Sequence, residues 1–135
     1  MNIALMADDT KKEMMIQLCI AYKKILGNHQ LCATAKTGKL VGDATGLDIV
    51  KFLSGDQGGH QQIAAKISWN EIDMVLYFRD PKLQTRNDND HGDNNIIRLC
   101  DVNNIAIATN IATAEVLIHG LERGDLDWRE ILKTM

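Results

Sequence analysis

The feature that most constrains the fold is the alternation of short apolar runs with helix-patterned segments along the chain. Behind the first run, apolar residues recur at helical intervals, at Met14, Leu18, Ala21 and Ile25. Such alternation favours a parallel sheet with helices on both faces. We therefore predict an α/β fold with a doubly wound, parallel five-stranded sheet flanked by helices, in one domain over residues 1–135. The predicted strands are 3–7, 31–35, 47–53, 72–78 and 105–108.

Caps and chain breakers predict where the helices begin and end. Thr10 and Glu13 have the capping-box spacing, and Gly27 with Asn28 ends the helix behind them. The segment from Arg79 to Asn94 is polar and is predicted to be a long loop, which in a small protein is usually functional or mobile. The other predicted helices are 40–44, 61–69, 96–102, 113–121 and a final turn at 127–132.

Composition and charge limit the kinds of partner. The net charge is -3 and no run of lysine and arginine dominates, which argues against a nucleic-acid partner. No apolar run approaches the length of a membrane span, so no membrane partner is expected. The three cysteines are widely spaced and fit neither a disulfide framework nor a zinc site. This pattern is typical of reduced thiols in a cytoplasmic protein, and we expect no metal and no cofactor.

Lysines, hydroxyls and glycines follow the predicted strands. In an open parallel sheet, ligands bind beyond the carboxyl ends of the strands. Hydroxyl and backbone N–H groups donate to phosphate oxygens, and glycine lets the backbone come close to them. Each residue alone reads more simply as a turn or cap, but the same chemistry at successive strand ends favours a phosphate site. The residues predicted to bind a phosphorylated small molecule are Lys12, Thr34, Lys36, Thr37, Gly38, Ser54, Gly55, Gly59 and His60.

These segments resemble the methylglyoxal synthase family over nearly the whole chain. The resemblance is carried by Ala7-Asp8-Asp9, Thr34-Ala35-Lys36-Thr37-Gly38, the glycine-rich run 54–62, Asp80-Pro81 and the run 108–115. It implies the fold of that family, a homohexamer, and conversion of dihydroxyacetone phosphate to methylglyoxal and inorganic phosphate. In that family a carboxylate removes a carbon-bound proton, and the resulting enediolate expels phosphate.

The chain departs from the family at positions that carry the chemistry. His60 stands where the resemblance places the general base, an aspartate. Asp8 stands where a histidine is usual, and Lys36 stands where a phosphate-binding threonine is usual. Further along, the register is open: Asp90 matches the family's second aspartate in one alignment, with His91 or Asp93 as alternatives. The candidate catalytic residues are therefore His60, Asp90, Asp9 and Asp80.

Two functions follow from these departures. An unperturbed imidazole titrates near 6.5, which suits proton abstraction, but a nearby phosphate dianion favours the imidazolium, which is no base. His60 and Lys36 also make the site more cationic, as a nucleotide-type ligand would require. We therefore predict a protein that senses or sequesters a phosphorylated small molecule without catalysis. The alternative is an active methylglyoxal synthase that uses His60, Asp90 or a neighbouring carboxylate.

Overall fold

A computed structural model of the chain describes residues 1–85 and 91–133. The strands are β1 (Asn2–Ala7), β2 (Gln30–Ala33), β3 (Ile49–Lys51), β4 (Met74–Phe78) and β5 (Ala106–Ala108). The α-helices are α1 (Lys12–Ala21), α2 (Lys23–Leu26), α3 (Ala35–Thr45), α4 (Gly59–Ser68), α5 (His91–Asn103), α6 (Ile111–Arg123) and α7 (Trp128–Lys133). Three short 3-10 helices follow strands: η1 (Asp9–Lys11), η2 (Gly55–Gln57) and η3 (Pro81–Thr85).

The strands form one parallel sheet in the order β3-β2-β1-β4-β5, which confirms the predicted fold class. β1 is the central strand, with Ile3 opposite Leu31 on one side and Met74 on the other. Every residue of β4 is buried, as expected for a strand covered on both faces, and such strands read as continuous apolar runs. This burial explains why β4 could be recognised in the sequence as a strand.

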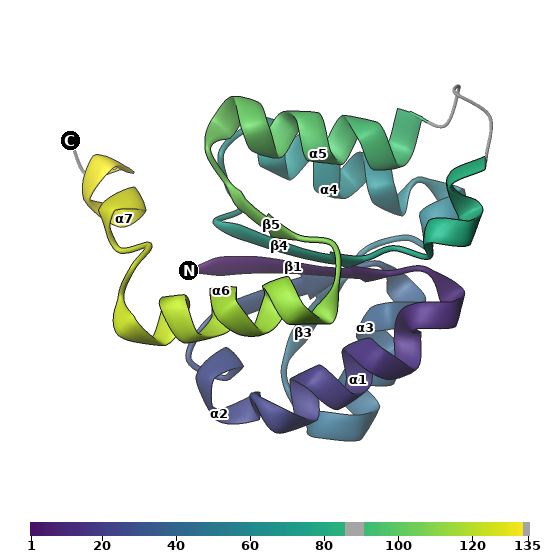
Figure 1. Cartoon of the computed structure of the whole chain (residues 1–135), viewed down its shortest axis with the longest axis horizontal. Coiled ribbons are helices and arrows are strands. Elements are labelled where there is room, and N and C mark those ends of the chain that lie inside the picture. The colour runs from purple at the N-terminus through teal and green to yellow at the C-terminus, as the bar shows by residue number, and fades with distance from the viewer. Residues whose placement is uncertain (86–90, 134–135) are drawn as a thin grey trace.

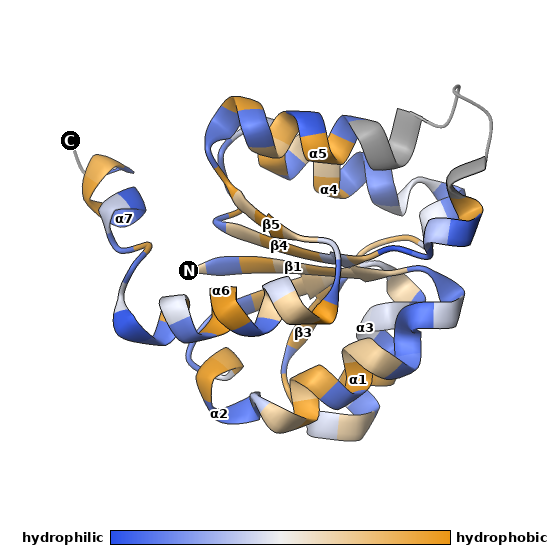
Figure 2. Cartoon of the chain, in the orientation of Figure 1, coloured by the Kyte–Doolittle hydropathy of each residue, from blue (hydrophilic) through white to orange (hydrophobic). Residues whose placement is uncertain are grey.

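Helices cover both faces of the sheet, with α4 and α5 on one side and α1, α3 and α6 on the other (Figure 1). Side chains alternate along a strand, so β1 sends Ile3 and Leu5 into the second layer and Ala4 and Met6 into the first. The hydropathy colouring follows this division, with apolar residues on the strands and on the helix sides that meet them (Figure 2). Two apolar cores therefore fix the helices on the sheet and leave the strand ends for other contacts.

Three local predictions are wrong. α3 begins at Ala35 rather than near residue 40, because Gly38 does not turn the chain: its amide donates to the Thr34 carbonyl and closes the first helical turn. The segment predicted as one loop over 79–94 contains η3 and the start of α5. The predicted capping box also fails, since α1 has no side-chain cap and the Thr10 hydroxyl donates to Asp80 instead. Within residues 1–85 and 91–133, no helix has the length and apolar character needed to cross a membrane.

Candidate active site

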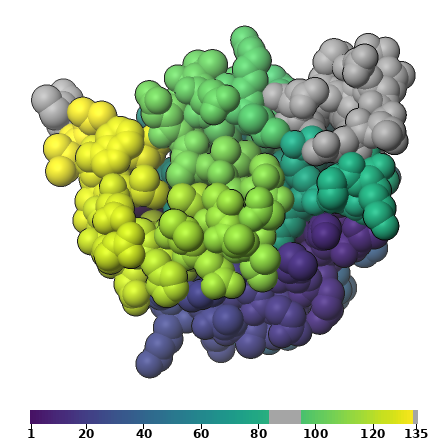
Figure 3. All heavy atoms as spheres, in the orientation of Figure 1, coloured from purple at the N-terminus to yellow at the C-terminus, as the bar shows by residue number. Residues whose placement is uncertain are grey.

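A cavity of about 790 Å³ opens at the carboxyl edge of the sheet. It lies where the segments after neighbouring strands β1 and β4 part toward opposite faces, the usual ligand site of an open α/β sheet. On the surface, the residues after β1 meet the residues after β4 beside this edge (Figure 3). The lining residues are Ala7, Asp8, Asp9, Thr10, Lys12, Thr34, Lys36, Ser54, Gly55, Asp56, His60, Asp80 and Leu83.

Most of the predicted site residues share this cavity. It brings together Asp9, Lys12, Thr34, Lys36, Ser54, Gly55, His60 and Asp80. These residues follow four different strands, and the parallel sheet gathers them because it places all carboxyl ends at one edge. The donors and acceptors expected to hold a phosphorylated molecule thus face one space.

Three predicted residues lie behind the cavity wall. The amide of Gly38 donates to the Thr34 carbonyl, and the amide of Gly59 donates to the Ser54 carbonyl, so neither is available to a ligand. Gly59 is needed for packing instead, because a Cβ there would lie 2.1 Å from the Leu53 carbonyl oxygen. Thr37 is 1% exposed and accepts a hydrogen bond from Lys12.

The catalytic candidate Asp90 lies outside the residues that the structure describes. The same holds for the side chains of His91 and Asp93, although their backbone belongs to the first turn of α5. The open choice of register in this segment therefore stays a prediction.

Lys12 is the most firmly placed cation of the cavity. Its ammonium donates to the Ala7 carbonyl at 2.6 Å and to the Thr37 hydroxyl at 3.3 Å. It lies 3.4 Å from an Asp9 oxygen, and its side chain is only 13% exposed. Lys36 lies 3.8 Å from the same Asp9 oxygen, but its side chain is 66% exposed. The cavity therefore offers one largely buried and one exposed positive charge.

His60, at the start of α4, forms another part of the cavity wall. Its ring meets Tyr77 edge to face, with the centroids 5.7 Å apart. A Cβ at position 55 would lie 3.0 Å from His60 Nε2, so Gly55 is what lets the imidazole stand against the backbone of η2. This packing fixes a ring that can accept or donate a proton beside the space for a ligand.

Asp80 is held more tightly than the other carboxylates of the cavity. One oxygen accepts from the Thr10 hydroxyl at 2.6 Å, and the other accepts from the Lys82 amide at 2.9 Å. The hydrogen bond from Thr10, followed by that from Lys82, lowers the pKa of the Asp80 carboxyl below its usual value. Asp80 is therefore a weaker proton acceptor than an ordinary carboxylate.

Three polar residues that line the cavity are not among the candidate catalytic or binding residues predicted from the sequence. Asp8 binds the backbone N–H of Asp80 at 2.7 Å, and Thr10 binds its carboxylate. Asp56 accepts a hydrogen bond from the Ser54 hydroxyl at 2.7 Å. The sequence analysis noted Asp8 as a departure from the family without giving it a role, and it assigned Thr10 to a helix cap. In the part of the chain that the structure describes, no group of three or more His, Cys, Asp or Glu side chains is arranged to hold a metal ion.

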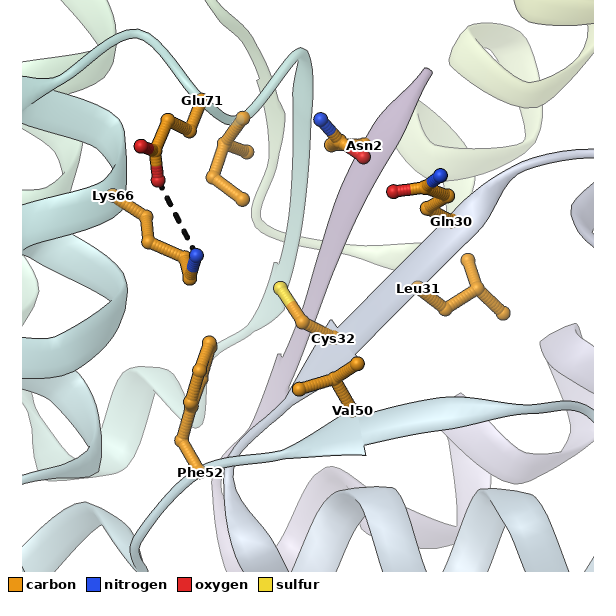
Figure 4. A pocket seen from close by; sticks show the side chains of 9 residues that line it. Asn2, Gln30, Leu31, Cys32, Val50, Phe52, Lys66 and Glu71 are labelled. Carbon is orange, nitrogen blue, oxygen red and sulfur yellow. Dashed lines mark hydrogen bonds and ion pairs between the residues drawn. The ribbon is translucent and has the colours of Figure 1, made fainter.

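A second cavity, of about 380 Å³, lies on the sheet face beside α4 (Figure 4). Its apolar lining residues are Leu31, Cys32, Val50, Phe52 and Ile72. Its lysine, Lys66, is already paired with Glu71 at 3.3 Å. Burial raises the pKa of the Cys32 thiol to about 11, so this sulfur is not a ready nucleophile. None of the predicted site residues lines this cavity.

Comparison with known proteins shows which family the chain is similar to. The family model of MGS-like domains matches residues 14–109. The chain is 56% identical over 132 residues to a methylglyoxal synthase of Caldicellulosiruptor saccharolyticus, covering 98% of this chain and 92% of the relative. It is 53% identical over 133 residues to a methylglyoxal synthase of Oceanobacillus iheyensis, covering 98% and 94%.

A solved structure shares the fold. The crystal structure of methylglyoxal synthase from Elizabethkingia anophelis NUHP1 superposes with a TM-score of 0.79 and 36% sequence identity. The match covers 87% of this chain and 76% of that protein. The match therefore extends over most of the fold and is accompanied by substantial sequence identity.

The prediction of a non-catalytic protein that binds a nucleotide-type ligand is wrong. Relatives that are 53–56% identical over nearly the whole chain are named as synthases, which favours the active alternative. The physical reason is that an imidazole in place of a carboxylate exchanges one proton acceptor for another. In addition, Asp9 opens onto the same cavity, so the change at His60 does not remove basic groups from it.

Proposed function

Because this chain belongs to the family of MGS-like domains, we propose that it converts dihydroxyacetone phosphate to methylglyoxal and inorganic phosphate. The observation that carries the proposal is the single cavity in which His60 and Asp9 share the walls with Lys12 and Lys36. Proton acceptors and phosphate-binding cations are the two sets of groups that this elimination needs.

The reaction begins when a base takes a proton from the hydroxymethyl carbon next to the ketone. The electrons of that C–H bond form the enediolate. The hydroxyl of the former hydroxymethyl carbon then loses its proton and becomes the aldehyde carbonyl, a C=C bond forms to the phosphate-bearing carbon, and the electron pair of the breaking C–O bond leaves with phosphate. Of the two protons removed, one returns to the terminal carbon of the enol, which becomes methylglyoxal, and the other goes to phosphate. We assign the carbon-bound proton to His60 and a hydrogen bond from the substrate hydroxyl to Asp9.

The cations stabilise the charge that leaves. Lys12 is held in place by Ala7 and Thr37, so its ammonium needs little reorganisation to donate to a phosphate oxygen. Thr34 and Lys36 line the same cavity and add donors, and the Ser54 hydroxyl adds another when it turns from Asp56 to the phosphate. As the phosphate dianion departs, these donors take up its negative charge.

The test is to incubate the pure protein with dihydroxyacetone phosphate and to measure methylglyoxal and phosphate together. We expect both products in equal amounts, and His60→Ala is expected to lower kcat by about 100- to 10,000-fold. His119→Ala, at an exposed histidine on α6, is the matched control and is expected to keep wild-type kcat. No methylglyoxal from the wild-type protein would overturn the proposal.

The pH profile identifies the base. A histidine base works in its neutral form, so the rate should rise with pH as the base loses its proton. His60→Asp should keep measurable activity and move this rise to lower pH, because carboxylates titrate lower. A rise at the same pH in both proteins would assign the proton transfer to another group.

We extend the proposal to assembly and location. A homohexamer accounts for exposed apolar side chains such as Val50, Leu53 and Trp69, which copies of the chain would bury. A cytoplasmic location is supported by Cys19, Cys32 and Cys100, which are all free thiols.

A further inference from the structure

Two hydrogen bonds join the segment after β1 to Asp80, which follows β4. The Asp8 carboxylate accepts from the Asp80 amide at 2.7 Å. In return, the Asp80 carboxylate accepts from the Thr10 hydroxyl at 2.6 Å. Its other oxygen accepts from the Lys82 amide of its own segment at 2.9 Å. Asp8 and Thr10 are distant from Asp80 in sequence and meet it only because β1 and β4 are neighbours in the sheet. We call Asp8, Thr10 and Asp80 the cross-loop clamp.

Asp9 lies between the two clamped residues of the first segment. Its own side chain is 81% exposed, and its ion pairs are with Lys12 at 3.4 Å and with Lys36 at 3.8 Å. Those distances exceed a well-formed charge-assisted hydrogen bond, so they fix the carboxylate weakly. Its place at the cavity therefore depends on the backbone, which Asp8 and Thr10 anchor on both sides.

Asp80 is ill suited to exchange a proton with the substrate. Both of its oxygens already accept hydrogen bonds, and the bonds from Thr10 and Lys82 hold its pKa below the usual value. A carboxylate engaged in this way is a weak base and a good anchor.

We propose that Asp80 is a positioning residue that, through Thr10 and Asp8, holds the Asp9 carboxylate at the reacting part of the substrate. This inference deepens the proposed synthase function and rests on it for its catalytic consequence. Lys12 has its own anchors at Ala7 and Thr37. Loss of the clamp should therefore disturb turnover more than phosphate binding.

The experiment compares Thr10→Val, which keeps the side-chain shape but removes the donor, with Thr10→Ser, which keeps the donor. We expect Thr10→Val to lower kcat about 10- to 100-fold with KM changed less than about threefold. Thr10→Ser should recover kcat to within about threefold of wild type. Thr113→Val is the matched control, since this exposed hydroxyl binds Asn110 and does not line the cavity. A kcat within twofold of wild type for Thr10→Val, or equal losses for the valine and serine variants, would overturn the inference.

A second measurement separates this inference from the proposed function. Amide hydrogen exchange over residues 7–12 of the ligand-free protein reports the clamp whether or not the protein turns over substrate. We expect faster exchange there in Thr10→Val than in wild type, and no change in Thr113→Val. If the wild type makes no methylglyoxal but the exchange rises, the synthase function fails and the clamp stands. If the wild type is active and the exchange is unchanged, the clamp fails alone.

Discussion

The two edges of the sheet carry the same kinds of charged side chains in opposite circumstances. At the amino edge, Asp73 is 2% exposed and accepts from the Asn2 amide at 2.8 Å, from Arg129 at 3.1 Å and from Lys133 at 2.6 Å. At the carboxyl edge, Asp9 is 81% exposed and stands 3.4 Å or more from its lysines. The charges at the amino edge are buried and paired with one another, whereas those at the carboxyl edge are accessible to a ligand.

This difference in burial indicates that the charges at the amino edge stabilise the fold. Arg129 binds Asp73, Asn70 and three backbone carbonyls, and so ties α7 to the start of the sheet (Figure 1). Burial raises the pKa of Asp73, but the hydrogen bonds from Lys133, the Asn2 amide and Arg129 outweigh this effect and leave the pKa below its usual value. Removing a partner there strands a buried charge, whereas removing one at the cavity exposes a group to water.

The largest expected effect is on folding. Arg129→Met should lower the free energy of unfolding by about 3–5 kcal/mol, because it breaks a buried pair and orphans several carbonyls. Arg123→Met, which removes an exposed pair with Asp125, should cost less than about 1 kcal/mol. Urea unfolding measures both.

The pH dependence of stability tests the role of the buried pair between Asp73 and Arg129. Because the folded-state pKa of Asp73 is lowered, its stabilisation is present above the carboxyl's ordinary value and is lost as the pH falls through the lowered one. The gap in stability between wild type and Arg129→Met should therefore narrow below about pH 4. A gap that stays constant to lower pH would show that Arg129 acts through its carbonyl contacts instead.

At the carboxyl edge, the next largest effect is expected for Lys12→Met. Loss of a charge-assisted hydrogen bond of about 1.5–3 kcal/mol should lower kcat/KM about 10- to 100-fold and weaken inorganic phosphate binding, with little change in stability. Lys39→Met, at an exposed lysine paired with Asp43, is the control and should leave both quantities unchanged. Unaltered phosphate affinity in Lys12→Met would refute the role of this lysine.

The smallest effect is expected for Lys36→Thr, which introduces the threonine that is usual at this position in the methylglyoxal synthase family. The side chain is 66% exposed, so the change should raise KM only about two- to fivefold. Added salt should erase the difference, since water and ions already screen this charge. A larger, salt-independent loss would place Lys36 in direct contact with the substrate.

The sequence was enough to predict the type of site and some of the residues that line it. Residues such as Lys12, Ser54 and His60 follow strands, and parallel strands place such residues at one edge. Thr37 and Gly38 were also predicted as site residues because they follow β2. They lie within α3, which places them behind the cavity wall. Position after a strand indicates the edge and not the direction in which a side chain points.

Taken alone, the sequence determined the parallel α/β sheet, because buried strands and amphipathic helices leave a periodic apolar pattern. The tertiary structure alone decided that Thr10 meets Asp80, and that Arg129 closes over Asp73. Both contacts join residues more than 50 positions apart, and they depend on strand order and helix docking. A local pattern carries no record of which distant segment lies beside it, so only the folded chain supplies these pairs.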